Sequence, residues 1–314
     1  MITNLAIVLV LLLLSFVPAN SSEITNGSVR IPSSFGFVPF LMNFSGTNFE
    51  VSASGNNLFA PAFAPCTPSG VFCTAGSVFN LSAQSGQWDF SDLSGTMIID
   101  GTQYFFVNDP SPTPPNLAGS GFLSFTGASV MIPFGDAPTV TLRAPFTMNG
   151  FLSGRAGVFA VGLNPLSGSG TAFLVLHSSV SGGQQIYLLD SLSYRFGAPV
   201  TVDIKPGEEP NKINLRSRGT VPVAILSTPT FDASTVNPLS VTVAEAAVNL
   251  KPNGTFASSL QDVNGDGLLD MVIHISIPTL QLTNFATEVL VEGMTFDGKY
   301  FWGTDNVVVF QRQP

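Results

Sequence analysis

Acidic and amide side chains recur at alternate positions in the segment DVNGDGLLD, residues 262 to 270. Only 10% of the chain is Asp, Glu, Lys or Arg, so this density of carboxylates stands out. A hard divalent cation such as calcium takes roughly six to eight oxygen ligands, and a tight loop can supply them from alternate residues. The candidate ligands are the side chains of Asp262, Asn264, Asp266 and Asp270 and the backbone carbonyl of Leu268.

The loop shares its spacing with the first part of an EF-hand and then departs from it. Gly267 stands where the chain must turn sharply, but Ile273 occupies the position of the bidentate Glu. Ile273 belongs to MVIHIS, which alternates like a strand. The segment therefore predicts an Asp-rich loop that leads into a strand and binds structural calcium weakly. The alternative is a bare turn, since Asp, Asn and Gly are good turn formers, but its carboxylates would repel one another.

No catalytic constellation is visible in the sequence. His177 precedes Ser178 and Ser179, but neighbouring strand residues point to opposite faces, so their adjacency does not make a nucleophile and base. His274 lies in a strand pattern four residues after Asp270, where we expect a histidine satisfied by a neighbour; the alternative is an outer-shell partner of the metal loop. The chain has no nucleophile elbow, phosphate loop, dinucleotide fingerprint or zinc-protease motif. We therefore assign no catalytic residue and no organic cofactor.

Two aromatic clusters offer a sharper binding hypothesis. Residues 104–106 and 300–302 each follow an Asp-Gly pair. Exposed rings on a sheet face can stack on sugars, although alternation buries about half of any strand and core packing is the default. A carbohydrate-binding module is therefore an alternative to a purely structural protein.

The overall charge limits the partners. The chain has 11 basic and 20 acidic residues and a formal net charge of −9. Such a surface repels phosphate backbones and anionic lipid headgroups. We expect no nucleic-acid partner.

The first residues predict export. The apolar run from Leu5 to Leu14 is shorter than the roughly 20 residues of a spanning helix, and a small-residue cleavage site ends at Ala19. We interpret residues 1–19 as a signal peptide; the alternative is an uncleaved anchor, because this segment lacks Lys and Arg. No later apolar run approaches spanning length. We expect a secreted or cell-surface protein with no membrane span in the mature chain.

The cysteines agree with an oxidising compartment. Cys66 and Cys73 bracket the loop TPSGVF, which a small disulfide can close. Two cysteines alone make a poor zinc site because further ligands are missing nearby. The alternative is a pair of free thiols.

Short apolar runs between turns predict an all-β fold. The chain has 30 Gly and 23 Pro, and its first half shows no sustained helical repeat. Asp100-Gly101 lies between two β-rich arms and predicts a tight hairpin, whereas the proline-rich residues 108–116 predict a loop. Lysine occurs only from Lys205 onward, in a stretch rich in Pro and Gly that suggests a boundary near residue 199. We predict two β-sandwich-like domains of immunoglobulin or jelly-roll type: an N-terminal β-sandwich or barrel at 20–198 and a calcium-loop sandwich at 199–314.

The second half carries a resemblance in several ordered blocks. VTVDIKPGEEPNKINLRSRGTVPVAILSTPTFDASTVNPLSV, LQDVNGDGLLDMVIHI and TEVLVEGMTFDGKYFWGTDNVVV resemble an uncharacterised module found near the C-termini of secreted bacterial proteins. The resemblance covers roughly residues 200 to 310. It implies an extracellular accessory β-sandwich whose Asp loop binds calcium, and it implies nothing catalytic. SIPTLQLTNFA, after the loop, departs from the polar, glycine-bearing segment common in related sequences.

Together these observations predict an exported, non-catalytic binding or structural protein. Its C-terminal domain would be stabilised by calcium, and its partner would be an extracellular protein or a glycan. The alternatives are a carbohydrate-binding module and a secreted hydrolase with its site in the N-terminal domain.

Overall fold

The computed structural model describes residues 22–32, 39–57, 66–67, 73–80, 88–127, 129–133 and 137–312. In these ranges the fold is all-β, which confirms the predicted class. The helical elements described there are short 3-10 turns: η1 (Ala233–Thr235), η2 (Pro238–Ser240) and η3 (Ile277–Thr279). The predicted signal peptide, residues 1–19, lies outside the described residues. None of the helices in the described ranges has the length and apolarity needed to cross a bilayer.

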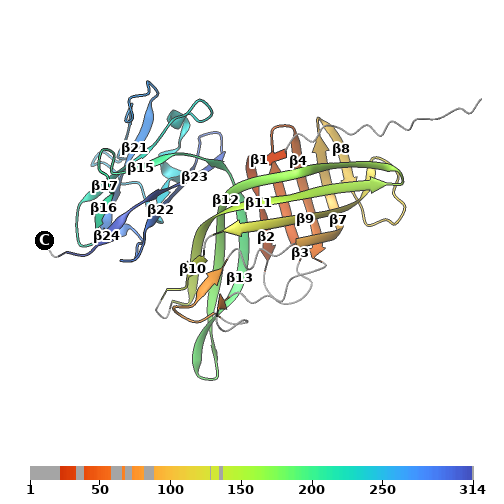
Figure 1. The fold of residues 1–314 in the computed structure, drawn as a ribbon, viewed down its shortest axis with the longest axis horizontal. Helices are drawn as coiled ribbons and strands as arrows, with labels where there is room; N and C mark the ends of the chain where they lie inside the picture. The colour runs from red at the N-terminus through yellow and green to blue at the C-terminus, as the bar shows by residue number, and fades with distance from the viewer. Residues whose placement is uncertain are drawn as a thin grey trace, which may run out of the picture.

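The N-terminal part is built on one ten-stranded sheet whose ends meet (Figure 1). Its strand β13 pairs antiparallel with both β12 and β2, which closes the sheet into a barrel. This continuous pairing distinguishes it from a sandwich of two separate sheets. The strands of the closed ring are β2 (Asn26–Pro32), β3 (Pro39–Ser45), β4 (Phe49–Asn57), β7 (Trp88–Ile99), β9 (Asn116–Gly127), β11 (Thr139–Ala156), β12 (Phe159–Ser181) and β13 (Gln184–Phe196).

Shorter strands complete the N-terminal part. β1 (Ser22–Ile24) pairs parallel with β12, and β8 (Thr102–Phe106) pairs with β7 and β9. A separate three-stranded sheet has the order β10-β6-β5, with β5 at Cys66–Thr67, β6 at Val78–Asn80 and β10 at Ser129–Met131.

Side chains fill the interior of the barrel. Along β11 the residues alternate between buried and exposed, as a strand with one core-facing side requires. Aromatic rings dominate the centre: Phe125 stacks on Tyr194 at 3.7 Å between ring centroids, and Phe146 meets Tyr194 and Phe196 edge to face at 5.0 and 5.2 Å. Such pairs add stability beyond the area that they bury. The wall of the barrel is therefore a rigid support for what lies on its outer face.

The hairpin predicted at Asp100-Gly101 is confirmed. Both residues have positive φ, 49° and 75°, and Ile99 pairs with Thr102 across a two-residue turn. The proline-rich segment from residue 108 lies outside the strands up to the start of β9 at Asn116, as predicted.

The C-terminal part consists of two facing sheets around a second core. That core joins residues from both sheets, among them Val223 and Ile273 on one side and Val291 and Phe301 on the other. One sheet has the order β14 (Ala198–Pro199), β23 (Tyr300–Asn306), β22 (Glu288–Met294), β18 (Thr242–Val243) and β19 (Ala246–Ala247). The other has the order β15 (Val202–Ile204), β17 (Thr220–Ile225), β21 (Asp270–Ser276) and β20 (Ser258–Gln261), and β16 (Lys212–Asn214) pairs with β24 (Val308–Phe310).

The chain passes between the two parts without a free linker. Gly197 donates its N–H to Ser169 of β12 at 3.1 Å, and the next residues, β14, pair with β23. A Cβ at Gly197 would lie 2.4 Å from the Tyr300 ring, so this close approach requires glycine. The chain therefore passes directly from the last strand of the barrel into the edge strand of a sandwich sheet.

The hydroxyl of Tyr194 provides a test of the barrel core. The Tyr194 side chain is fully buried, its hydroxyl has no hydrogen-bond partner among the described residues, and burial raises its pKa. We expect Tyr194→Phe to raise the free energy of unfolding by about 1 kcal/mol, because it removes an unsatisfied buried donor. A raised pKa in the folded state contributes stability that is present below the ordinary tyrosine value of 10.0 and is lost as the pH rises above it. The variant should therefore also lose less stability above pH 10.

Urea unfolding at several pH values measures both effects. Tyr104→Phe is the matched control, because Tyr104 is only partly buried. A clear destabilisation by Tyr194→Phe at neutral pH would contradict the view that this hydroxyl is unsatisfied.

Candidate functional site

The predicted calcium loop is a closed network of short-range hydrogen bonds. The Asp262 carboxylate accepts from the backbone N–H groups of Gly265, Asp266 and Gly267 at 2.8, 3.2 and 3.1 Å. Asn264 donates its side-chain amide to Asp266 at 3.0 Å. Gly265 and Gly267 have φ of 78° and 86°, which glycine adopts without strain. The loop thus presents its exposed oxygen-bearing side chains from one tight turn.

Asp270 differs from the other candidate ligands because it is fully buried. Its two oxygens accept from the backbone N–H groups of Ser227 and Val263, at 2.8 and 2.9 Å. The Ser227 hydroxyl in turn donates to the Leu269 carbonyl at 2.7 Å. Asp270 therefore fastens the loop to the end of β17, which is a structural role that its sequence position did not reveal.

The ligand atoms that the loop offers suit a hard cation, but they do not by themselves test the predicted calcium binding. All candidate ligands from Asp262 to Asp270 supply oxygen, the element that calcium prefers. Among the described residues, no three His, Cys, Asp or Glu side chains gather as a metal-binding group. The strand predicted after the loop is present, since β21 begins at Asp270 and contains the buried Ile273. Calcium binding stays a prediction.

The structure describes part of the predicted disulfide and the surroundings of His177. Cys73 is buried and disulfide-bonded, and the side chain of Cys66 lies outside the described residues, so the predicted pairing stays a prediction. His177 contacts a carboxylate on the neighbouring strand β13. Its Nδ1 lies 2.5 Å from a carboxylate oxygen of Asp190, the extra residue of a bulge in β13. Both side chains are nearly half exposed on the barrel wall, and sequence reasoning missed this pair.

The strongest polar cluster lies where the barrel meets the sandwich. Arg143 of β11 forms an ion pair with Glu292 of β22, whose side chain is only 8% exposed. The other oxygen of the Glu292 carboxylate accepts from the Tyr300 hydroxyl at 2.6 Å. Burial, followed by the negative charge of Glu292, raises the pKa of Tyr300. A buried carboxylate is thus held by donors from both parts of the chain.

Two cation–π contacts surround this carboxylate. The Arg143 guanidinium lies 5.2 Å from the ring centroid of its cross-strand neighbour Phe173. The Arg195 guanidinium lies 4.7 Å from that of Tyr300. Both arginines project from the outer face of the barrel, since Ala144 and Tyr194 beside them point into its core. The contact therefore combines charge pairing with stacking on aromatic faces.

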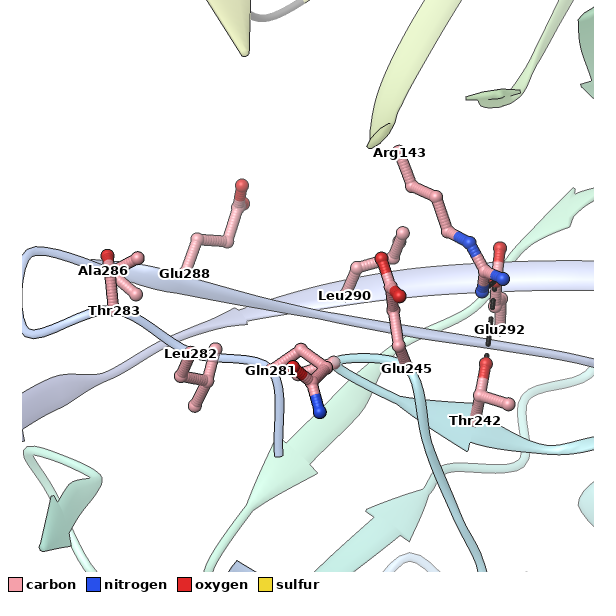
Figure 2. A pocket seen from close by; sticks show the side chains of 11 residues that line it. Arg143, Thr242, Glu245, Gln281, Leu282, Thr283, Ala286, Glu288, Leu290 and Glu292 are labelled. Atoms are coloured by element: carbon pink, nitrogen blue, oxygen red, sulfur yellow. Dashed lines mark hydrogen bonds and ion pairs between the residues drawn. The ribbon is translucent and has the colours of Figure 1, made fainter. Parts of the chain in front are cut away.

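A cavity of about 250 Å³ opens beside this cluster (Figure 2). Its walls come from β11, β18, the turn after β18, the segment 281–286 and β22. Figure 2 shows the carboxylates of Glu245 and Glu288 pointing to the side from which Arg143 reaches down. The lining residues are Arg143, Thr242, Ala244, Glu245, Gln281, Leu282, Thr283, Ala286, Glu288, Leu290 and Glu292.

One wall of this junction pocket is a strained turn. Ala244 and Glu245 connect β18 to β19 with φ of 43° and 66°, a left-handed pair that normally requires Asn or Gly. The turn is fastened on both sides: the Ala244 N–H donates to Leu290, and the Ala244 carbonyl accepts from Gln281, at 2.9 and 3.0 Å. The surrounding structure thus holds the Glu245 side chain at the cavity, and such over-determined strain is characteristic of functional sites.

Three of the six rings in the aromatic clusters at residues 104–106 and 300–302 are buried. Phe106, Tyr300 and Phe301 are 3% exposed or less, and Phe105 is 39% exposed. The default of core packing is therefore confirmed for these buried rings. An exposed ring lies instead near the junction pocket, where Phe285 is 85% exposed in a turn closed by the Ala286 N–H and the Thr283 carbonyl.

Sequence reasoning did not find the junction pocket. Its residues are spread from 143 to 292, and each looks ordinary in its own segment. A faint signal was present: the barrel part has only Arg30, Arg143, Arg155 and Arg195 as Lys or Arg residues, and two of them meet Glu292 and Tyr300. A charged side chain on a strand, in a part of the chain with few charges, is therefore a candidate for an ion pair or a cation–π contact.

Comparisons with protein-family models, with curated proteins and with solved structures found no match.

The Arg143–Glu292 pair yields a stability prediction. Arg143→Ala removes the charged partner of a buried carboxylate, so we expect the free energy of unfolding to fall by about 2 kcal/mol. Adding Glu292→Gln in the same chain should recover part of this loss, since the amide carries no charge to leave unpaired. Urea unfolding of the single and double variants measures the coupling.

Arg155→Ala is the matched control, because Arg155 lies exposed on the same strand. Equal losses from the two arginine variants would show that the buried carboxylate does not depend on Arg143.

Proposed function

We propose that this chain is an exported, non-catalytic binding protein that works at the cell surface or outside the cell. Its ligand site is the junction pocket, and calcium in the Asp262–Asp270 loop braces its C-terminal part. The observation that carries the proposal is a cavity of about 250 Å³ lined by side chains from both parts of the chain. Concave sites with a few convergent polar groups between structural units are the usual places for small ligands.

The lining of the pocket supports binding of a small polar molecule. The carboxylates of Glu245 and Glu288 and the hydroxyls of Thr242 and Thr283 offer hydrogen-bonding groups at the wall. The Arg143–Glu292 pair fixes the far side, because both its members are held by further contacts. Preformed polar groups of this kind fix ligand orientation at low entropic cost.

The support for an extracellular setting comes from the sequence. The predicted signal peptide and the low content of charged residues agree with export. The Asp-rich loop fits the millimolar calcium of extracellular fluids better than the cytosol, because its expected affinity is about 10⁻⁴ to 10⁻³ M. A calcium brace at the end of β17 would stiffen the sandwich that carries most of the pocket wall.

A panel of small polar ligands tests the binding site in the full chain. We expect at least one ligand class to raise the melting temperature of the wild type without being converted to product. Ala286→Trp should abolish this shift, because Ala286 lines the cavity and the indole would fill it. Thr287→Trp is the control, since Thr287 is exposed beside it and does not line the cavity.

Product analysis by chromatography separates binding from turnover. Conversion of a bound ligand that is lost in Glu245→Gln would replace the proposal by a hydrolase. Ligand binding that survives Ala286→Trp would place the site elsewhere.

Calcium dependence is tested on the same protein. At about 10 mM calcium, a loop with the expected affinity adds roughly 1.5 to 3 kcal/mol to the free energy of unfolding. The double change Asp262→Asn and Asp266→Asn should remove this gain, because it takes both exposed carboxylates from the loop. Glu50→Gln, an exposed carboxylate on β4, should keep it. An unchanged unfolding midpoint of the wild type with and without chelator would exclude the calcium brace.

A further inference from the structure

We infer that the junction pocket binds a saccharide unit and prefers one that carries a protonated amine. The inference rests on the proposed function and specifies the ligand class of that site. It follows from the donors and acceptors that line the cavity, from its apolar wall and size, and from the exposed ring at its rim.

The polar wall needs a ligand that both donates and accepts. The carboxylates of Glu245 and Glu288 accept hydrogen bonds. The Thr283 hydroxyl can donate and accept, whereas the Thr242 hydroxyl donates to Glu292 at 3.4 Å and can still accept. Neighbouring hydroxyls on a sugar ring can donate to carboxylates and accept from threonine hydroxyls. A purely apolar ligand would leave these groups unsatisfied.

The remaining wall is apolar and matches the faces of a sugar ring. Ala244, Leu282, Ala286 and Leu290 line the cavity between the polar groups. The C–H face of a pyranose covers such a surface while its hydroxyls point to the rim. A volume of about 250 Å³ is below the range of roughly 300 to 1,000 Å³ typical of drug-sized ligands. One sugar ring fits inside, and further units of a chain extend past the rim.

Phe285 lies in a turn whose end residues belong to the cavity wall. Its ring is 85% exposed at the tip of the turn from Thr283 to Ala286, and both of these end residues line the cavity. An exposed ring next to a polar cavity gives a platform for stacking on a sugar face. Oligosaccharides should therefore bind more tightly than single units.

The charge of the wall favours amino sugars. Glu292 is compensated by Arg143, whereas Glu245 and Glu288 form no salt bridge with any described residue. Two uncompensated carboxylates repel uronic acids and sulfated sugars and attract an ammonium group. A charge-assisted hydrogen bond to the amine then adds to the hydroxyl contacts.

Titration calorimetry on the full chain tests this ligand class with four probes. They are glucosamine oligomers, N-acetylglucosamine oligomers, glucose oligomers of the same length and 1,5-diaminopentane. We expect glucosamine oligomers to bind about tenfold more tightly than glucose oligomers, the effect of one charge-assisted hydrogen bond. Glu245→Gln and Glu288→Gln should each reduce that preference. Phe285→Ala should weaken oligomers by roughly two- to tenfold and leave single units unchanged.

Two control variants separate these effects from general surface changes. Phe296→Ala removes a ring that is 70% exposed in the turn between β22 and β23, and Glu50→Gln removes an exposed carboxylate of the barrel. Neither should alter binding of any probe.

The outcomes distinguish this inference from the proposed function. Diaminopentane binding as tightly as glucosamine oligomers, with no binding of neutral sugars, would make the pocket a site for organic cations and overturn the inference. Failure of every saccharide, while another ligand class binds in a manner abolished by Ala286→Trp, would overturn the inference and leave the binding function standing. Failure of every ligand class would overturn both.

Discussion

The arrangement of the two parts depends on one buried carboxylate. Glu292 carries its charge into a nearly closed contact, where an unpaired ion would cost several kcal/mol. The chain satisfies it with Arg143 from the barrel and with Tyr300 from the sandwich. Because Arg143 lies on β11 of the barrel and Tyr300 on β23 of the sandwich, the carboxylate is fully satisfied only when the barrel wall and the sandwich face are correctly placed. Charge pairing thus specifies the contact more tightly than apolar burial, which is non-directional.

This constraint also creates the pocket. The Arg143 side chain reaches from a strand of the barrel to form one wall of a cavity whose other walls are sandwich elements. The strained turn at Ala244 and Glu245 is held by the strand β22 that carries Glu292. The strand β22 therefore contacts both the barrel, through Glu292, and the strained turn, through Leu290. A chain with so few charged residues has gathered several of them here and several others in the Asp262–Asp270 loop.

The sequence predicted the features that short-range chemistry determines. Asp100-Gly101 specified a hairpin because only certain residues tolerate its backbone angles, and Ile273 specified a strand after the acidic loop through local alternation. Closure of the first sheet could not be predicted from short-range patterns, because it depends on pairing between β13 and β2, which lie far apart in the chain. Glu292 also escaped notice, since its partner Arg143 is remote in sequence and nothing in either strand identifies the other.

The entry of the chain into the sandwich has a consequence for assembly. β14 and β16, two of the first three strands after the barrel, pair in parallel with β23 and β24 near the end of the chain. Parallel partners need a long connection, and here nearly the whole sandwich is that connection. A chain cut before β23 would complete the barrel and yet lack Tyr300 at the junction. The Glu292 carboxylate therefore gains its Tyr300 partner only after most of the sandwich has been synthesised, so one of the later strands completes the contact with the barrel.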